Sequence, residues 1–96
     1  MTTSVLVDEK ALKLNPFMSN LTGNIILCLA NSLKAAEGKH IEFTMQENDL
    51  QLFIDSNEVP LDLGHAKQIV GNILQGLLKS LHGAEAGQKF RFICEQ

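Results

Sequence analysis

Two segments of the chain repeat each other, and this repetition restricts the folds that 96 residues can adopt. The segment "GNIILCLANSLKAAE" (23–37) matches "GNILQGLLKSLHGAE" (71–85) at eight of fifteen positions. The similarity continues upstream, where Val7–Asn15 aligns with Ile54–Asp62, and downstream, where "IEFTM" aligns with "FRFIC". Stacked repeat proteins generally need three or more units. Two copies therefore predict one domain with an internal, approximate twofold axis.

Each copy carries the local signals of two strands joined by a tight turn. Asp8–Lys10 and Asp55–Glu58 are clusters of turn-forming residues between apolar stretches. In "KHIEFTMQENDLQLFID" (39–55), apolar residues alternate on both sides of a polar turn, which predicts a hairpin between the two copies. The expected order within each copy is strand, turn, short strand, helix and strand.

The two helices have start and stop signals at matching places. Asn15 followed by Pro16 is typical of an N-cap with proline at the first helical position. Asp62 is expected to cap the second helix in the same way. Gly38 and Gly83 stand where the two helices are expected to end.

These elements predict an α+β fold. We expect two ββαβ units, at about residues 3–46 and 50–95 of a single domain spanning 1–96. Both helices are expected to pack on one face of a mostly antiparallel sheet. The alternative is a ferredoxin-like βαββαβ sandwich, in which the short hairpin strands are only loop edges.

Helical spacing predicts which side of each helix is buried. Each helix has one apolar stripe, as expected for a helix that lies on a sheet. The stripe of the first helix contains Met18, Leu21, Ile25, Ile26, Leu29, Leu33 and Ala36, and that of the second contains Ala66, Ile69, Val70, Ile73, Leu74, Leu77 and Leu81.

Small residues predict a contact between the helices. Cys28 and Ser32 lie four residues apart on one edge of the first helix. Gly76 and Ser80 occupy the same edge of the second helix. Because small side chains let two backbones approach closely, we expect the helices to touch along this edge. The alternative is that the two serines hydrogen-bond to a carbonyl one turn earlier.

Two helices can cover only one face of a sheet, so the other face is expected to be open. Alternation directs Glu42, Arg91 and Ile93 to the open face. The set that faces the helices is Phe43, Met45, Phe90, Phe92 and Cys94. Glu42 and Arg91 are equivalent in the two copies and lie opposite each other if their strands pair. Leu27, Phe53 and Ile93 are the candidate residues of a partner surface.

Charge and composition argue against several classes of protein. The formal charge is −3, the pI is about 5.5, and the eight basic residues are scattered, which argues against nucleic-acid binding. The longest apolar run, Ile25–Ala30, is far too short to span a membrane. The first residues lack the basic and apolar regions of a secretion signal. We therefore expect a cytoplasmic protein.

Candidate chemical groups are few. Cys28 and Cys94 are far apart, and no histidine has a cysteine or carboxylate at metal-ligand spacing, so no metal or cofactor is expected. Asp62 and His65, near the start of the second helix, form the candidate polar site. An enzyme would use His65 with Asp62 or Glu58, but no nucleophile motif accompanies them. No catalytic residue is assigned.

The leading hypothesis is therefore a non-catalytic interaction or regulatory protein. It is expected to form a homo-oligomer, most simply a dimer, or to bind a protein partner through the open sheet face or an edge strand. The alternative is a module that binds an apolar small molecule in a pocket between the helices and the sheet.

Overall fold

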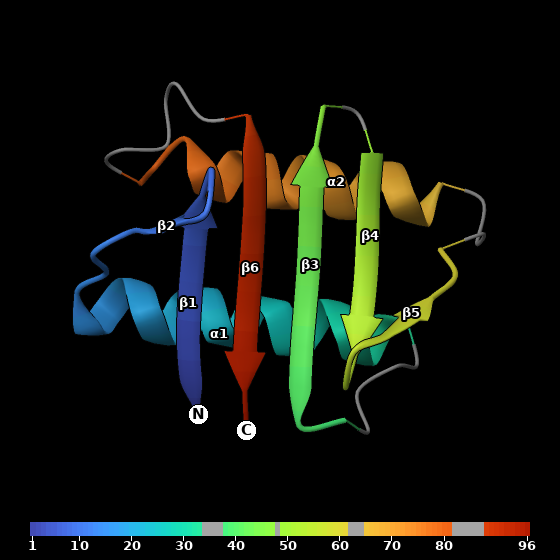
Figure 1. The fold of residues 1–96 in the computed structure, drawn as a ribbon, viewed down its shortest axis with the longest axis horizontal. Coiled ribbons are helices and arrows are strands. Elements are labelled where there is room, and N and C mark those ends of the chain that lie inside the picture. The colour runs from blue at the N-terminus through green and yellow to red at the C-terminus, as the bar shows by residue number, and fades with distance from the viewer. Residues whose placement is uncertain (34–37, 48, 62–64, 82–87) are drawn as a thin grey trace.

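The computed structural model of the chain describes residues 1–33, 38–47, 49–61, 65–81 and 88–96. Within these ranges the chain forms two helices and a six-stranded antiparallel sheet, which is an α+β fold (Figure 1). The elements are β1 (Thr2–Val7), β2 (Lys10–Ala11), α1 (Pro16–Ser32), β3 (His40–Gln46), β4 (Asp49–Ile54), β5 (Asn57–Val59), α2 (Ala66–Leu78) and β6 (Lys89–Glu95).

The sheet interleaves strands from the two ends of the chain. Its order is β2-β1-β6-β3-β4-β5, and every pair of neighbours is antiparallel. Exchanging β1-β2-α1-β3 with β4-β5-α2-β6 leaves this order unchanged. Both short strands pair within the sheet, so the ferredoxin-like alternative, which treats them as loop edges, is not confirmed.

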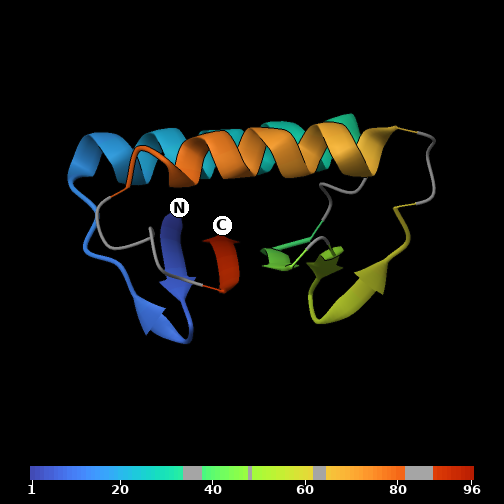
Figure 2. The same ribbon diagram turned by 90° about the horizontal axis from the view of Figure 1, so that it is seen from above.

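The helices form a single layer on one side of the sheet, as expected (Figure 2). They run in opposite directions across the strands, with α1 near the chain termini and α2 near the opposite end of the sheet (Figure 1). The outer strands β2 and β5 bend away from the helices, toward the uncovered side of the sheet (Figure 2).

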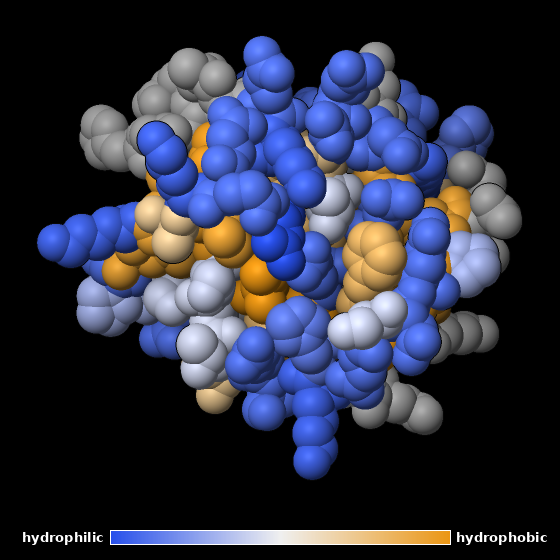
Figure 3. Space-filling model, viewed as in Figure 1, coloured by the Kyte–Doolittle hydropathy of each residue, from blue (hydrophilic) through white to orange (hydrophobic). Residues whose placement is uncertain are grey.

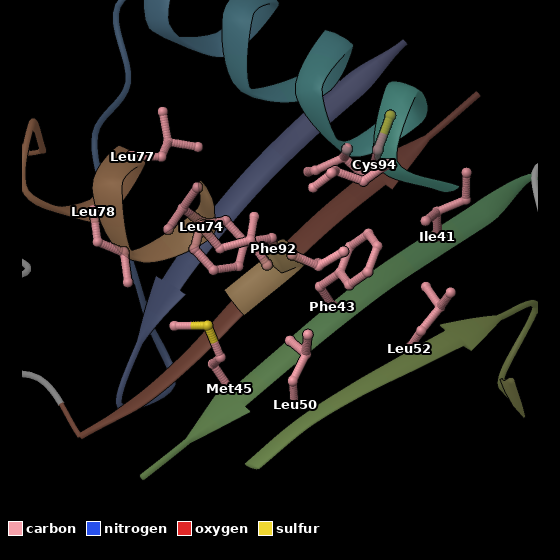
Figure 4. Close-up of a cluster of buried hydrophobic side chains, with 14 of the residues drawn as sticks. Ile41, Phe43, Met45, Leu50, Leu52, Leu74, Leu77, Leu78, Phe92 and Cys94 are labelled. Atoms are coloured by element: carbon pink, nitrogen blue, oxygen red, sulfur yellow. The ribbon is translucent and has the colours of Figure 1, made fainter. Parts of the chain in front are cut away.

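The core lies between the helix layer and the sheet. Alternate residues of the strands point into it, and Phe43 and Phe92 are cross-strand partners that are both fully buried. Figure 4 shows them with Leu74, Leu77 and Leu78 of α2. Fully burying one large apolar side chain contributes about 1.5–3 kcal/mol, so these alternating positions hold the two layers together. Residues expected to face the helices do so, although Phe90 is only half-buried.

Two equivalent turns join the first two strands of each half, β1 to β2 and β4 to β5. Asp8 and Glu9 have φ values of 51° and 69°, and Asp55 and Ser56 have values of 49° and 70°. Two successive residues in the left-handed region are characteristic of a type I′ hairpin turn, whose twist matches that of the strands. The predicted turn clusters are therefore confirmed at both places.

Each turn is also fastened to the other half of the chain by its aspartate. Asp8 Oδ1 accepts hydrogen bonds from the N–H groups of Gln88 (3.1 Å) and Lys89 (2.9 Å) at the start of β6. Asp55 Oδ1 accepts from Lys39 (3.1 Å) and His40 (2.9 Å) at the start of β3. These donors, with Lys89 the stronger, lower the pKa of Asp8 because they favour its ionised form.

The helix boundaries agree only in part with their sequence signals. Asn15 caps α1 as predicted, since its Oδ1 accepts a hydrogen bond from Met18 N at 2.7 Å. The helix ends at Ser32, so the prediction that Gly38 terminates it is wrong. Gly83 lies outside the described residues.

The second helix starts later than its alignment with the first predicts. It begins at Ala66, so His65 precedes the helix and does not lie in its first turn. The side chain of His65 makes no capping hydrogen bond. Four residues separate β2 from α1, whereas six separate β5 from α2, and this difference moves the helix start. Asp62, the expected cap, lies outside the described residues.

The buried sides of the helices are rotated relative to the predicted stripes. Thr22 and Ala30 are fully buried, whereas Leu21, Ile69 and Ile73 are 37%, 56% and 41% exposed. Each apolar stripe is wider than the surface that the sheet can cover, so its outer edge remains exposed.

The predicted contact between the helices is wrong. Cys28 and Ser32 of α1 are exposed, as are Gly76 of α2 and Ser80 just beyond it. A side chain built on Gly76 would meet no atom within 4 Å. Ser32 Oγ instead donates to Cys28 O at 2.9 Å, which is the alternative that its spacing suggested.

Thr22 provides a test of the core. Its side chain is fully buried, and its hydroxyl has no hydrogen-bond partner among the described residues. Replacing Thr22 with Val removes the unpaired hydroxyl at nearly constant shape, so we expect stability to rise by about 1 kcal/mol and Tm by roughly 4 °C. Thermal unfolding at one fixed protein concentration measures this. Thr22→Ser, which keeps the hydroxyl and loses a methyl group, should lower Tm. An equal or lower Tm for Thr22→Val would contradict this account of the core.

Candidate functional site

The open face of the sheet is largely hydrophilic, with apolar side chains between the polar ones (Figure 3). At its centre Arg91 of β6 makes a two-pronged ion pair with Glu42 of β3. Arg91 Nε lies 2.8 Å from Glu42 Oε2, and Arg91 Nη2 lies 2.9 Å from Glu42 Oε1. This fork-to-carboxylate geometry is among the stronger charge-assisted hydrogen bonds in proteins.

Further groups extend this ion pair into a network. Arg91 Nη1 donates to Glu9 Oε2 at 3.0 Å, and Lys89 Nζ lies 3.3 Å from Glu9 Oε1. Thr44 Oγ1 donates to Glu42 Oε2 at 2.9 Å. The hydrogen bonds from Arg91 lower the pKa of Glu42, and Glu42 in turn raises the pKa of Arg91. The central charges of this face therefore satisfy one another.

The sequence anticipates this pair but not its register. Glu42 lies opposite Ile93, and Arg91 lies opposite Thr44. The two charged residues are therefore diagonal neighbours on paired strands, a separation that long side chains bridge. The expectation that the two side chains meet is confirmed. The expectation that they lie directly opposite each other is wrong, because Arg91 is two residues away from Ile93, the residue opposite Glu42.

The structure brings together two of the three candidate partner residues. Phe53 and Ile93 lie on either side of Glu42 in one row across the open face, and both are half-buried. Leu27 lies in the helix layer instead, where it is half-buried and packs against the core. It therefore does not belong to the same surface as the other two.

Only part of the candidate polar site lies within the described residues. His65 is exposed and borders a hollow that Met45, Leu50 and Gly71 also line. Glu58 lines a different hollow, and Asp62 lies outside the described residues. Within the ranges that the structure describes, no three histidine, cysteine or acidic residues gather as metal ligands.

The surface that the sequence interpretation missed lies on the outside of the helix layer. Phe17, Leu21, Ile69 and Ile73 are 69%, 37%, 56% and 41% exposed. Cys28 is exposed two turns after Leu21, on the same side of α1. We call the surface formed by these five residues the helix face. The five residues come from two antiparallel helices that begin at opposite ends of the layer (Figure 1).

The exposed apolar residues of each helix lie on the side that is turned toward the other helix. A side chain on Gly23 would meet Met1 and Thr3 at the start of β1, so Gly23 faces away from α2. Leu21 is two residues from Gly23, which places it about 200° around the helix, on the opposite side. Gly71 lines the hollow near the β3–β4 turn, away from α1, and Ile69 and Ile73 are each two residues from it.

One signal in the sequence marks this surface. The chain has eight basic and eleven acidic residues, nineteen in all, and only Lys67 lies in either helix. Lys67 forms an ion pair with Asp49 at 2.9 Å, which lowers the pKa of that carboxyl. A helix that faces water normally carries charged residues on its outer side. Residues 16–32 carry no charge, and the exposed polar residues of this helix include Asn20, Asn24 and Asn31.

Comparisons with protein-family models, curated proteins and solved structures find no match to this chain. In the part of the chain that the structure describes, no helix is long and apolar enough to cross a membrane.

The ion pair on the open face gives a pH-dependent prediction. The pKa of Glu42 is lowered from its ordinary value of 4.5, so its stabilising effect is complete above that pH and is lost as the pH falls through the lowered value. Glu42→Gln should be less stable than the wild type near pH 7, and the difference should shrink toward pH 3. Urea midpoints at both pH values measure it.

Asp49→Asn is the matched control, because the Asp49–Lys67 pair is exposed and such pairs contribute little. It should change the midpoint less than Glu42→Gln does near pH 7. A Glu42→Gln difference that stays constant over the acidic range would show that the pair does not stabilise the fold through its charge.

Proposed function

We propose that the protein is a small, non-catalytic interaction module that self-associates. The observation that carries this proposal is the helix face, whose large apolar side chains are 37–69% exposed on a layer that no other described element covers (Figure 2). Burying such surface stabilises an association by about 25 cal/mol for each Å² of apolar area removed from water.

The polar groups of the molecule support a binding role rather than catalysis. The charges at the centre of the open face form ion pairs with one another, so both carboxylate oxygens of Glu42 and three N–H donors of Arg91 are already in hydrogen bonds.

The two halves of the chain, within one domain, are proposed to be an internal duplication related by an approximate twofold axis. The support is that two local features occur in both halves. The turns at Asp8 and Asp55 have the same φ values within a few degrees. Each aspartate also accepts two backbone hydrogen bonds from the last strand of the other half.

A pocket for an apolar ligand between the helices and the sheet is the weaker candidate. The described residues at that level, including Ile26, Phe43 and Leu74, are fully buried against one another. A reducing cytoplasmic location belongs to the proposal as well, and the free thiols of Cys28 and Cys94 are consistent with it.

Self-association predicts a mass above that of one chain. Light scattering coupled to size-exclusion chromatography should give about twice 10.6 kDa at high concentration and a fall toward one chain on dilution. Sedimentation equilibrium of the same samples provides an independent measure. A mass of one chain at every concentration tested would overturn the proposal.

A further inference from the structure

The hollow that His65 borders lies beside α2, close to the turn between β3 and β4. Its volume is about 360 Å³, within the range of about 300–1,000 Å³ that is usual for small-molecule sites. We infer that this hollow binds a small neutral heterocycle of the purine type, as the free base or the nucleoside. This binding role goes beyond the proposed self-association and does not depend on it.

The floor of the hollow is apolar and includes a thioether. Met45 of β3 and Leu50 of β4 border the hollow and are cross-strand partners, and each is only 5% exposed. Figure 4 shows the two side chains next to each other. The sulfur of methionine makes favourable contacts with aromatic rings. A floor of this kind suits a flat ring better than a charged group.

An aromatic side chain borders the same hollow. His65 is exposed and precedes α2, and its ring makes no capping hydrogen bond. Aromatic rings prefer to stack on or meet the edge of other rings. The imidazole and the thioether of Met45 therefore both favour an aromatic ligand over an aliphatic one.

The wall of the hollow is a stripe of amide side chains on α2. Gln68, Asn72 and Gln75 border it at intervals of four and three residues, so they lie on one side of the helix. Each amide offers hydrogen-bond donors and an acceptor side by side. Asparagine and glutamine use this pair of groups to bind the amino group and the adjacent ring nitrogen of adenine. The wall therefore matches the edge of a purine.

The charged groups at the rim disfavour an anion. Lys67 borders the hollow, but its Nζ lies 2.9 Å from Asp49 Oδ1, so its charge is already paired. Glu47 also borders the hollow and adds a carboxylate. A phosphate bound there would approach this like charge, which is costly. A base or nucleoside has no such charge, whereas a nucleotide does.

Gly71 leaves room for the ligand. It borders the hollow, and a side chain built on it would meet no described atom within 4 Å. Gly23, which aligns with Gly71 in the sequence, differs in this respect. A side chain built on Gly23 would meet Met1 and Thr3, so the chain itself fills that space.

The first test measures the binding of adenosine by isothermal titration calorimetry. We expect a dissociation constant of roughly 0.1 mM, because a ligand of this size gains only a modest affinity from each of its atoms. In nitrogen–proton NMR spectra, the amide signals of Met45, Leu50 and Gly71 should shift most. AMP carries the same ring with a phosphate and should bind about tenfold more weakly or less, because of the carboxylate of Glu47.

The second test fills the hollow. Gly71→Leu places a side chain in it, and Gly76→Leu is the matched control, since Gly76 lies on the same helix and also has no described atom within 4 Å. Leucine favours a helix more than glycine does, so both variants should fold and keep or raise Tm. Gly71→Leu should weaken adenosine binding by about tenfold or more, because the side chain takes the space of the ring. Gly76→Leu should leave it unchanged.

A further variant removes one amide without filling the hollow. Asn72→Leu keeps a side chain of similar size and should weaken adenosine binding by about tenfold, the effect of losing a hydrogen bond. Asn24→Leu is its control, because Asn24 is the exposed residue of α1 that aligns with Asn72. Circular dichroism of all four variants checks that they fold.

The outcomes separate this inference from the proposed function. Absence of adenosine binding at millimolar concentration overturns the purine site, and so does binding that survives both Gly71→Leu and Asn72→Leu. AMP that binds as tightly as adenosine overturns the assignment of a neutral ligand. Binding that is lost in Gly71→Leu and kept in Gly76→Leu supports the inference. The mass of the wild type tests self-association separately, so the failure of either proposal leaves the other standing.

Discussion

The packing of a two-helix layer on the alternating side chains of one sheet face is the constraint on which the rest of the structure depends. Side chains of a strand point alternately to its two faces, so burying Phe43 and Phe92 sends Glu42 and Arg91 to the opposite side. The same geometry that builds the core therefore also builds the ion pair. Because the helices have a sheet on only one side, the other side of each helix must find water or a partner.

The distribution of charge follows this division into layers. The sheet face away from the helices holds Arg91, Glu42 and Glu9 in hydrogen bonds of 2.8–3.0 Å, which keeps them stable beside water. The helix layer has almost no charge, although it too lies on the surface. The charged groups of the sheet face are therefore paired with one another, whereas the helix layer exposes large apolar side chains.

Much of the fold could be predicted from the sequence because its signals are local. The turn at Asp8, the cap at Asn15 and the alternation through Phe43 each depend on a few adjacent residues. The start of α2 was misplaced because its distance from β5 depends on where the helix settles on the sheet. The exposure of Ile69 and Ile73 could not be predicted, since helical periodicity shows that a stripe is apolar but not how much of it a sheet will cover. The same limit applies to the candidate partner residues. Phe53 and Ile93 share a row of the open sheet face, whereas Leu27, which the sequence places on the polar side of the first helix, packs half-buried in the helix layer.

The interleaved strand order has a consequence for how the protein is made. The sheet places β6 between β1 and β3, so the N-terminal strand has its longest partner at the far end of the chain. A nascent chain on the ribosome can form the β3–β4 hairpin early, but β1 must wait for β6 to emerge before its inner edge is paired. Such distant pairings slow folding. The unpaired strands would meanwhile be open to association with other nascent chains, so the insertion of β6 between β1 and β3 is the step that closes the sheet.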